Sequence, residues 1–224
     1  MKKFLYLLLL PALLLTTLTA LTACEDNTGE EELAEFTFDW QNRNAKFFNE
    51  RMDEAKTAIA EAKAAHGDDW AAHCDWRIFR SYAKMPGGKT ADSICVRITE
   101  RGTGSGHPLY TDSVRVNYVG RLMPTESYAE GRVFDHSGLY DTDDYVFNPD
   151  FCTPASFAVS SLIEGFTTAL MQMRVGDRWR IYIPQELGYM NVTTTAIPAY
   201  STLVFDLQLK GFYRAGTSTL NVAL

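Results

Sequence analysis

Residues 112–137 read DSVRVNYVGRLMPTESYAEGRVFDHS, and this stretch decides the fold. Its first half, up to Leu122, alternates between apolar and polar residues, so that Val114, Val116 and Tyr118 share one face. Side chains of a strand point alternately to opposite faces of a sheet. The alternation therefore predicts an antiparallel strand with one buried face, followed by a loop and a short segment around Phe134.

Further segments of the same kind lie on both sides of this stretch. We expect strands at 76–82, 94–100, 178–184 and 202–213, where β-branched and aromatic residues are frequent and turn residues separate the runs. A short helix is predicted at 163–173, with Leu170 and Met173 on its inner face. Several antiparallel strands and one short inner helix predict an α+β fold.

A long helix is expected before this domain, from Trp40 to His66. Apolar residues and a final histidine recur there at steps of three and four: Ala45, Phe48, Met52, Ala55, Ile59, Ala62 and His66. This spacing is typical of an amphipathic helix, and Gly67 is a suitable residue to end it. The apolar stripe either docks on the following domain or pairs with a second copy of the chain, so a homodimer through this helix remains an alternative.

The N-terminus has the organisation of an export signal. Lys2 and Lys3 precede an apolar run that is short and contains Pro11, which favours a cleaved signal over a transmembrane helix. The residues LTAC at 21–24 resemble the lipobox of bacterial lipoproteins, in which the cysteine is lipidated and cleavage occurs just before it. The resemblance implies that Cys24 carries the lipid anchor. An ordinary secretory signal with an incidental cysteine is the alternative.

The segment 24–39 is acidic after Cys24 and predicts an extended tether. Glu25 beside the cysteine resembles sorting signals that direct some Gram-negative lipoproteins to the outer membrane or cell surface, although a plain solvated linker is equally consistent. We therefore expect a protein that is anchored by lipid in the cell envelope, in the outer membrane, and that faces either the periplasm or the cell surface.

Composition excludes several classes of protein. With 224 residues, 46% hydrophobic and 22% charged, the chain resembles neither a disordered nor a polytopic membrane protein. A net charge of −7 argues against nucleic acid as the main partner. The chain also contains no nucleophile elbow, no zinc-protease motif, no P-loop and no dinucleotide-binding fingerprint.

No metal site is expected. Cys74, Cys95 and Cys152 have no zinc-ligand spacing, and small buried hydrophobic residues are the favoured interpretation, with their disulfide state left open. The acidic residues of the loop around Asp141 and Asp144 lack the full ligand set of a calcium loop, so a solvated loop is preferred.

Six short blocks of sequence follow one another between residues 116 and 206. They read VNYVG with GRVFDHS (116–137), LIEGF (162–166), MRVGD (173–177), IPQELGY (183–189), IP (197–198) and LVFD (203–206). Together they resemble FKBP-type peptidyl-prolyl cis-trans isomerases over residues 94–213. The resemblance implies an FKBP-like curved antiparallel sheet wrapped around a short helix, with an isomerase domain at 92–214. The other parts would be a signal peptide at 1–23, the tether at 24–39, a helical extension with a strand at 40–91, and a tail at 215–224.

The chemistry implied by this resemblance needs no cofactor. Rotation about a peptide bond has a barrier of about 18–20 kcal/mol because of amide resonance, and uncatalysed X-Pro exchange takes tens to hundreds of seconds. No bond is broken, so neither a nucleophile nor a metal is required. A dry aromatic pocket for the proline ring, with a few oriented polar groups, can favour the twisted amide over the planar one.

The resemblance also implies which residues do this. The catalytic residues would be Tyr118, Asp135, Ile163 and Tyr189, and the substrate-binding residues would be Phe134, Leu162, Phe166, Ile197 and Phe205. Asp135 would accept a hydrogen bond from Tyr118, while the Ile163 N–H and the Tyr189 hydroxyl would donate to substrate carbonyls. Phe166 occupies the position of the family's usual tryptophan.

Two departures from the family pattern affect this site. Ala155 stands where the family has an aromatic wall, which predicts that one side of the pocket is open or is closed by Phe147 or Phe151. Met190 replaces a glycine in the loop after Tyr189.

From the resemblance as a whole we expect a prolyl isomerase that assists the folding of exported proteins. The alternative is a non-catalytic peptide-binding module or assembly factor at the membrane that uses the same groove.

Overall fold

The structure is a computed structural model that describes residues 34–139 and 146–221. The predictions for Cys24, for the signal, for most of the tether and for the acidic residues around Asp141 and Asp144 fall outside these ranges. Within the described ranges, none of the helices combines the length and the apolar character needed to cross a bilayer.

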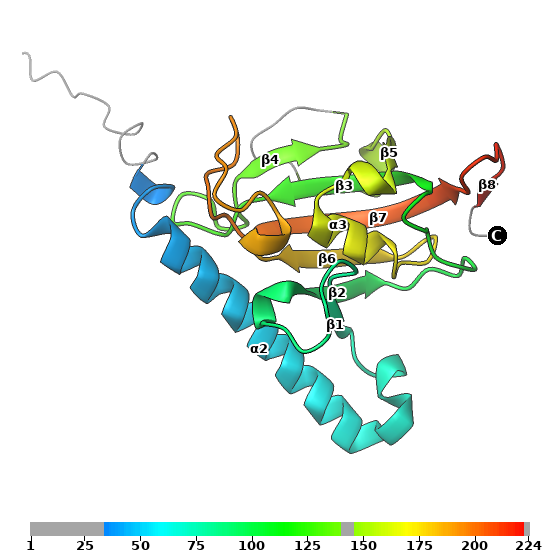
Figure 1. Cartoon of the computed structure of the whole chain (residues 1–224), viewed down its shortest axis with the longest axis horizontal. Helices are drawn as coiled ribbons and strands as arrows, with labels where there is room; N and C mark the ends of the chain where they lie inside the picture. Colours follow the sequence, from blue (N-terminus) through cyan, green and yellow to red (C-terminus); the bar gives the residue numbers. More distant parts are fainter. Residues whose placement is uncertain (1–33, 140–145, 222–224) are drawn as a thin grey trace, which may run out of the picture.

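One antiparallel sheet of eight strands forms the body of the described chain, which confirms the α+β prediction (Figure 1). Its path is β1-β2-β6-β7-β3-β4, with β5 paired to β3 and β8 paired to β7. The strands are β1 Trp76–Arg80, β2 Ser93–Glu100, β3 Ser113–Arg121, β4 Val133–His136, β5 Ala155–Ala158, β6 Arg178–Ile183, β7 Leu203–Tyr213 and β8 Leu220–Asn221. β8 lies in the segment that the sequence analysis assigned to a tail.

The inner face of the sheet packs on the short helix α3, Glu164–Leu170. Leu203, Phe205 and Leu207 of the central strand β7 belong to the same buried cluster as Phe166 and Leu170 of this helix. The helix is shorter than the predicted range 163–173. Gly165 lets it approach β6 closely, because a Cβ atom there would lie 2.4 Å from Ile183 Cγ2.

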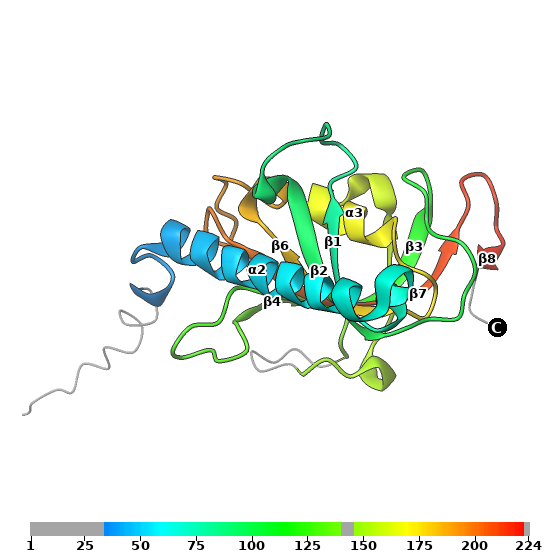
Figure 2. The ribbon, with the colours of Figure 1, turned by 90° about the horizontal axis from the view of Figure 1, so that it is seen from below.

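The long helix α2, Trp40–His66, has the predicted boundaries and lies along the opposite face of the sheet (Figures 1 and 2). Phe48, Met52 and Ala55 form a second buried cluster with residues of β1, β2, β6 and β7: Trp76, Cys95, Tyr182 and Val204. The apolar stripe therefore docks on the chain's own sheet, which is one of the two alternatives that its pattern allowed.

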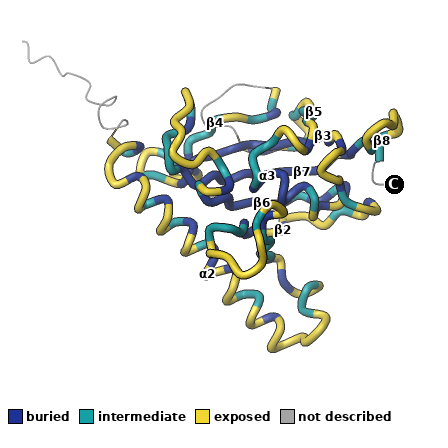
Figure 3. The backbone as a smooth tube through the Cα atoms, viewed as in Figure 1, coloured by how far each residue is buried: buried dark blue, intermediate teal, exposed yellow. Residues whose placement is uncertain are grey.

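The face that α2 buries differs in detail from the predicted stripe. Ala45 and His66 are exposed, whereas Asn44 is buried and lies beside Thr202. Figure 3 shows buried and exposed positions recurring along α2. The predicted stripe did not include Asn44 because it is polar, and Asn44 is buried because Thr202, just before β7, supplies hydrogen-bond partners for it.

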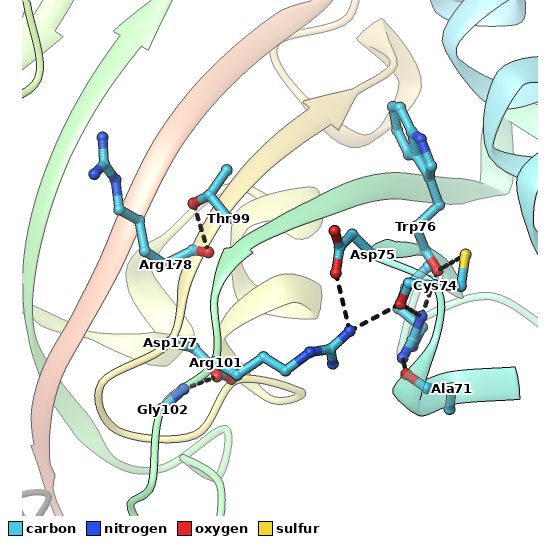
Figure 4. A network of polar contacts seen from close by, with 10 residues as sticks. Ala71, Cys74, Asp75, Trp76, Thr99, Arg101, Gly102, Asp177 and Arg178 are labelled. Carbon is cyan, nitrogen blue, oxygen red and sulfur yellow. Dashed lines mark hydrogen bonds and ion pairs between the residues drawn. The ribbon is translucent and has the colours of Figure 1, made fainter. Parts of the chain in front are cut away.

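Hydrogen bonds to backbone carbonyls attach the segment that follows α2 to the sheet (Figure 4). The chain continues from α2 into the 3₁₀ helix η1, Gly67–Ala72. The Arg77 guanidinium then donates to the carbonyls of Ala71, Cys74 and Trp76 at 2.5–2.8 Å. Arg101, after β2, donates to the Cys74 carbonyl at 2.8 Å and to the Asp75 carboxylate at 3.1 Å. These bonds join η1, β1 and the end of β2 into one unit.

The three described cysteines are free thiols. Cys74 and Cys95 are buried as predicted, but Cys152 is half-exposed, and its thiol donates to the Asn148 carbonyl at 3.2 Å. Burial raises the pKa of the Cys95 thiol to about 12, which keeps it protonated and unreactive at neutral pH.

Candidate active site

A cavity of about 320 Å³ opens between the inner face of the sheet and α3. Its walls come from β3, β4, β5, β7, α3, the end of the 3₁₀ helix η4 (Val159–Ser161) with the two residues after it, and the segment after η5 (Gln185–Leu187). The lining residues are Tyr118, Phe134, Asp135, Phe157, Ser161, Leu162, Ile163, Phe166, Tyr189 and Phe205. The size is near the lower end of the range for small-molecule sites and suits a small apolar ring.

Aromatic rings form most of the cavity, with Phe205 at their centre. The Phe205 ring lies 4.9 Å from that of Phe166 and 5.5 Å from that of Phe134, in both cases edge to face. The Tyr118 ring is 6.4 Å from Phe166 and 5.8 Å from Phe157, again edge to face. Edge-to-face contacts hold each ring in a defined orientation, so the apolar surface of the cavity is preorganised.

Gly120 on β3 is required for this arrangement. A Cβ atom at this position would lie 2.5 Å from the Phe134 ring and 2.7 Å from the Phe205 ring. Such distances are far below van der Waals contact, so any side chain would push the two rings apart. The glycine in the VNYVG block therefore lets two cavity walls approach the backbone of β3.

The polar edge of the cavity is centred on Tyr118 and Asp135. The Tyr118 hydroxyl donates to Asp135 Oδ2 at 2.7 Å, and the Asp135 side chain lies at the exposed rim. Ser137 fixes the Tyr118 backbone, because its hydroxyl accepts from the Tyr118 N–H at 2.9 Å. Burial raises the pKa of Tyr118 above its ordinary value, and the hydrogen bond to Asp135 raises it further.

Two further polar groups lie at the mouth. Ile163 is the N-cap residue of α3, where N–H groups precede the helical hydrogen-bond pattern. The next residue, Glu164, is held by the Ser81 hydroxyl, which donates to its carboxylate, and by an ion pair with Lys84 at 3.5 Å. Tyr189 lies in the loop after η5 and is 38% exposed, so its side chain remains accessible to a bound peptide.

The structure brings together eight of the nine residues that the sequence analysis placed at the site. Ile197 is the exception: it is buried, but it lines a separate cavity of about 770 Å³ together with Phe36, Trp40 and Arg132. That larger cavity lies between the start of α2 and the loop 193–200, and the ring cluster of Tyr118 and Phe205 does not line it.

Sequence reasoning missed two lining residues, Phe157 and Ser161. Phe157, two residues after Ala155 on β5, supplies an aromatic ring to the lining from this strand. Neither of the two proposed replacements serves as the wall: Phe147 packs against Val119 in another cluster, and Phe151 is exposed. The signal was present in the sequence, since Phe157 stands two residues after Ala155 and so shares its face of the strand.

The lining contains few nucleophilic side chains. It contains no cysteine, histidine or lysine, and its one serine, Ser161, donates its hydroxyl hydrogen to the Ala158 carbonyl at 2.8 Å. Over the described ranges, no three His, Cys, Asp or Glu side chains gather closely enough to hold a metal ion. Fold and cavity together define a class of α+β domain in which a small cavity is lined by fixed aromatic rings and bordered by polar groups.

Comparison with known proteins agrees with this class. The family model "FKBP-type peptidyl-prolyl cis-trans isomerase" matches residues 104–210. The FKBP-type 22 kDa peptidyl-prolyl cis-trans isomerase of Escherichia coli is 33% identical over 170 residues, which are 75% of this chain and 70% of that protein. The chain belongs to the FKBP-type peptidyl-prolyl cis-trans isomerase family.

Other relatives match a smaller part of their own length. The macrophage infectivity potentiator of Trypanosoma cruzi is 37% identical over 56% of this chain and 54% of that protein. FkpA of Escherichia coli is 32% identical over 72% of this chain and 52% of its own. This chain thus spans about half the length of these two relatives. The crystal structure of Escherichia coli FkpA has a TM-score of 0.45 and 24% identity, covering 84% of this chain and 71% of that one.

Proposed function

We propose that the aromatic cavity catalyses cis-trans isomerisation of X-Pro bonds in exported polypeptides. The observation that carries this proposal is the cluster of aromatic rings around Phe205, bordered by the Tyr118–Asp135 hydrogen bond. The proline ring enters the cavity and displaces water, and the amide preceding it lies at the polar rim. An amide that rotates loses resonance and charge separation, so a water-poor site favours the twisted form.

The polar residues orient the peptide during this rotation. Asp135 lies at the rim and holds the Tyr118 ring, which forms one wall beside Phe157 and Phe166. The Ile163 N–H and the Tyr189 hydroxyl donate to carbonyls on either side of the proline. Catalysis then comes from desolvation and orientation, and no group has to exchange a proton with the substrate.

Replacing Asp135 tests this proposal. Asp135→Leu removes the acceptor of the Tyr118 hydroxyl, so we expect kcat/KM in a proline-peptide isomerisation assay to fall about tenfold. The unfolding midpoint should change little, because the side chain is exposed. Glu186→Leu, an exposed carboxylate outside the cavity, is the matched control and should retain full activity. Equal activity of Asp135→Leu and the control would contradict the assignment of Asp135.

The pH dependence should be flat around neutrality. Folding raises the pKa of Tyr118 above its ordinary value of about 10, so the neutral phenol is favoured in the native state. Its contribution to stability is complete below that value and is lost only as pH rises through the folded pKa. We expect no Tyr118 titration in kcat/KM between about pH 6 and pH 9. A loss of activity within this range that Tyr118→Phe abolishes would contradict the prediction.

The second candidate function is peptide binding without catalysis. The observation that favours it is the exposed loop at Tyr189 and Met190, whose backbone is unusual at Met190 with φ 53°. A wild-type protein that binds proline peptides but does not accelerate their isomerisation would establish this alternative. Failure of both binding and catalysis would refute the site itself.

We also propose that the protein works in the cell envelope, anchored by acylated Cys24. The support is the LTAC tetrad after a short apolar run, followed by an acidic tether. Cys24→Ala should move the protein from the membrane fraction to the soluble fraction or block its processing, as measured by fractionation and intact mass. Cys74→Ala is a control that leaves the anchor intact. Unchanged membrane association and unchanged mass of Cys24→Ala would contradict the anchor.

A further inference from the structure

The loop between η5 and β7 carries Tyr189 and has an unusual backbone. Met190 has φ 53° and Tyr200 has φ 64°, both in the left-handed region that residues with a side chain rarely adopt. These two residues are joined, because the Tyr200 N–H donates to the Met190 carbonyl at 2.7 Å. Such conformations persist where the surrounding structure holds them in place.

Side chains in the first turns of α2 fix the backbone of this loop. Trp40 Nε1 donates to the Ser201 hydroxyl at 3.0 Å. Asn44 Oδ1 accepts from the Thr202 N–H at 2.8 Å, and the Thr202 hydroxyl donates to the Asn44 carbonyl at 3.0 Å. Ser201 and Thr202 directly follow Tyr200. The three bonds therefore fix the backbone immediately after the strained residue, and Figure 1 shows the start of α2 beside this loop.

Asn44 is itself held in one orientation. It is 1% exposed, and its Nδ2 donates to the Trp40 carbonyl at 2.8 Å. Its side-chain donor and acceptor are thus both used, one within α2 and one on the loop. A buried amide with fixed partners transmits the position of the helix to the backbone that it contacts.

The outer part of the same loop is attached to α2 through aromatic contacts. Arg132 donates to the Ala196 carbonyl at 3.3 Å, and its guanidinium lies 4.2 Å from the centre of the Phe36 ring. Phe36 in turn contacts the Trp40 ring edge to face at 5.4 Å. The first turn of α2 therefore contacts the loop directly, and the segment before it reaches the loop through Arg132.

We propose that Asn44 and Trp40 are positioning residues of the isomerase site. The path runs from α2 to Ser201 and Thr202, then through the Tyr200–Met190 hydrogen bond to Tyr189, which lines the cavity. The inference rests on the proposed function, since it assigns to α2 the placement of a residue of that site. Only the first turns of α2 have this role, since the later turns pack on the opposite face of the sheet.

The test compares two variants of the same helix in the full chain. Asn44→Ala should lower kcat/KM about tenfold, because a small displacement of an orienting group has a large effect on rate. It should also accelerate hydrogen exchange of the Tyr200 amide. Met52→Ala is the matched control: Met52 is buried on the same helix but belongs to a different cluster. It should lower the unfolding midpoint while leaving kcat/KM and Tyr200 exchange unchanged under folded conditions.

Two more variants keep the test decisive. Trp40→Phe keeps an aromatic ring but removes the hydrogen bond to Ser201, and it should lower kcat/KM about threefold. This variant carries the test if Asn44→Ala does not fold. On a Tyr189→Phe background, Asn44→Ala should lose most of its effect, because the group that it positions is gone. Full additivity, or equal kcat/KM and Tyr200 exchange in Asn44→Ala and Met52→Ala, would overturn the inference. An inactive wild-type protein would instead refute the proposed function, and Tyr200 exchange would still report on the loop.

Discussion

Phe205→Ala is expected to reduce the free energy of unfolding by about 3–5 kcal/mol and to lower kcat/KM by at least an order of magnitude. The Phe205 side chain is 5% exposed and contacts the rings of Phe134 and Phe166 edge to face. Its removal leaves a void in the packed centre of the sheet and enlarges the cavity that would hold the proline ring. Stability and activity should therefore fall together.

Phe212→Ala separates the two effects. Phe212 lies on the same strand β7 and is 1% exposed, but it does not line the aromatic cavity. Urea unfolding should show a similar loss of stability for both variants. Only Phe205→Ala should reduce kcat/KM when measured at a urea concentration and temperature at which both variants are folded. Equal kcat/KM in the two variants would show that Phe205 serves the core alone.

Met52→Glu is expected to destabilise the protein by about 3–5 kcal/mol, because it removes a buried thioether and places a carboxylate among apolar groups. Met52 is 1% exposed and belongs to the cluster that joins α2 to Trp76, Tyr182 and Val204 of the sheet. The transition should be followed by urea unfolding, and the native oligomeric mass by sedimentation.

Met52→Leu is the matched control and should cost less than about 1.5 kcal/mol, since volume and apolar character are conserved. Because α2 uses this stripe against its own sheet, Met52→Glu should leave the oligomeric mass of the folded protein unchanged. An unchanged unfolding midpoint, or dissociation of a native dimer by Met52→Glu, would contradict docking as the role of the stripe.

Local sequence patterns were sufficient to predict most of the helices and strands. The limits of α2 and the approximate positions of β2, β3, β6 and β7 follow from periodicity, because residues within one helix or strand decide its pattern of burial. The ordered blocks from VNYVG to LVFD were likewise sufficient to select eight of the ten cavity residues, including the Tyr118–Asp135 pair.

Tertiary structure decided which surfaces meet. Whether the α2 stripe packs on the sheet or on a second chain depends on contacts far apart in sequence, and these have no local signature. The same holds for Phe157, which becomes a wall only because β5 pairs with β3, and for Ile197, which the loop directs to another cavity. The burial of Asn44 depends on the Thr202 backbone, 158 positions away. The sequence by itself therefore determined the elements and most of the cavity lining, while long-range packing alone determined how α2 lies against the sheet and the loop before β7.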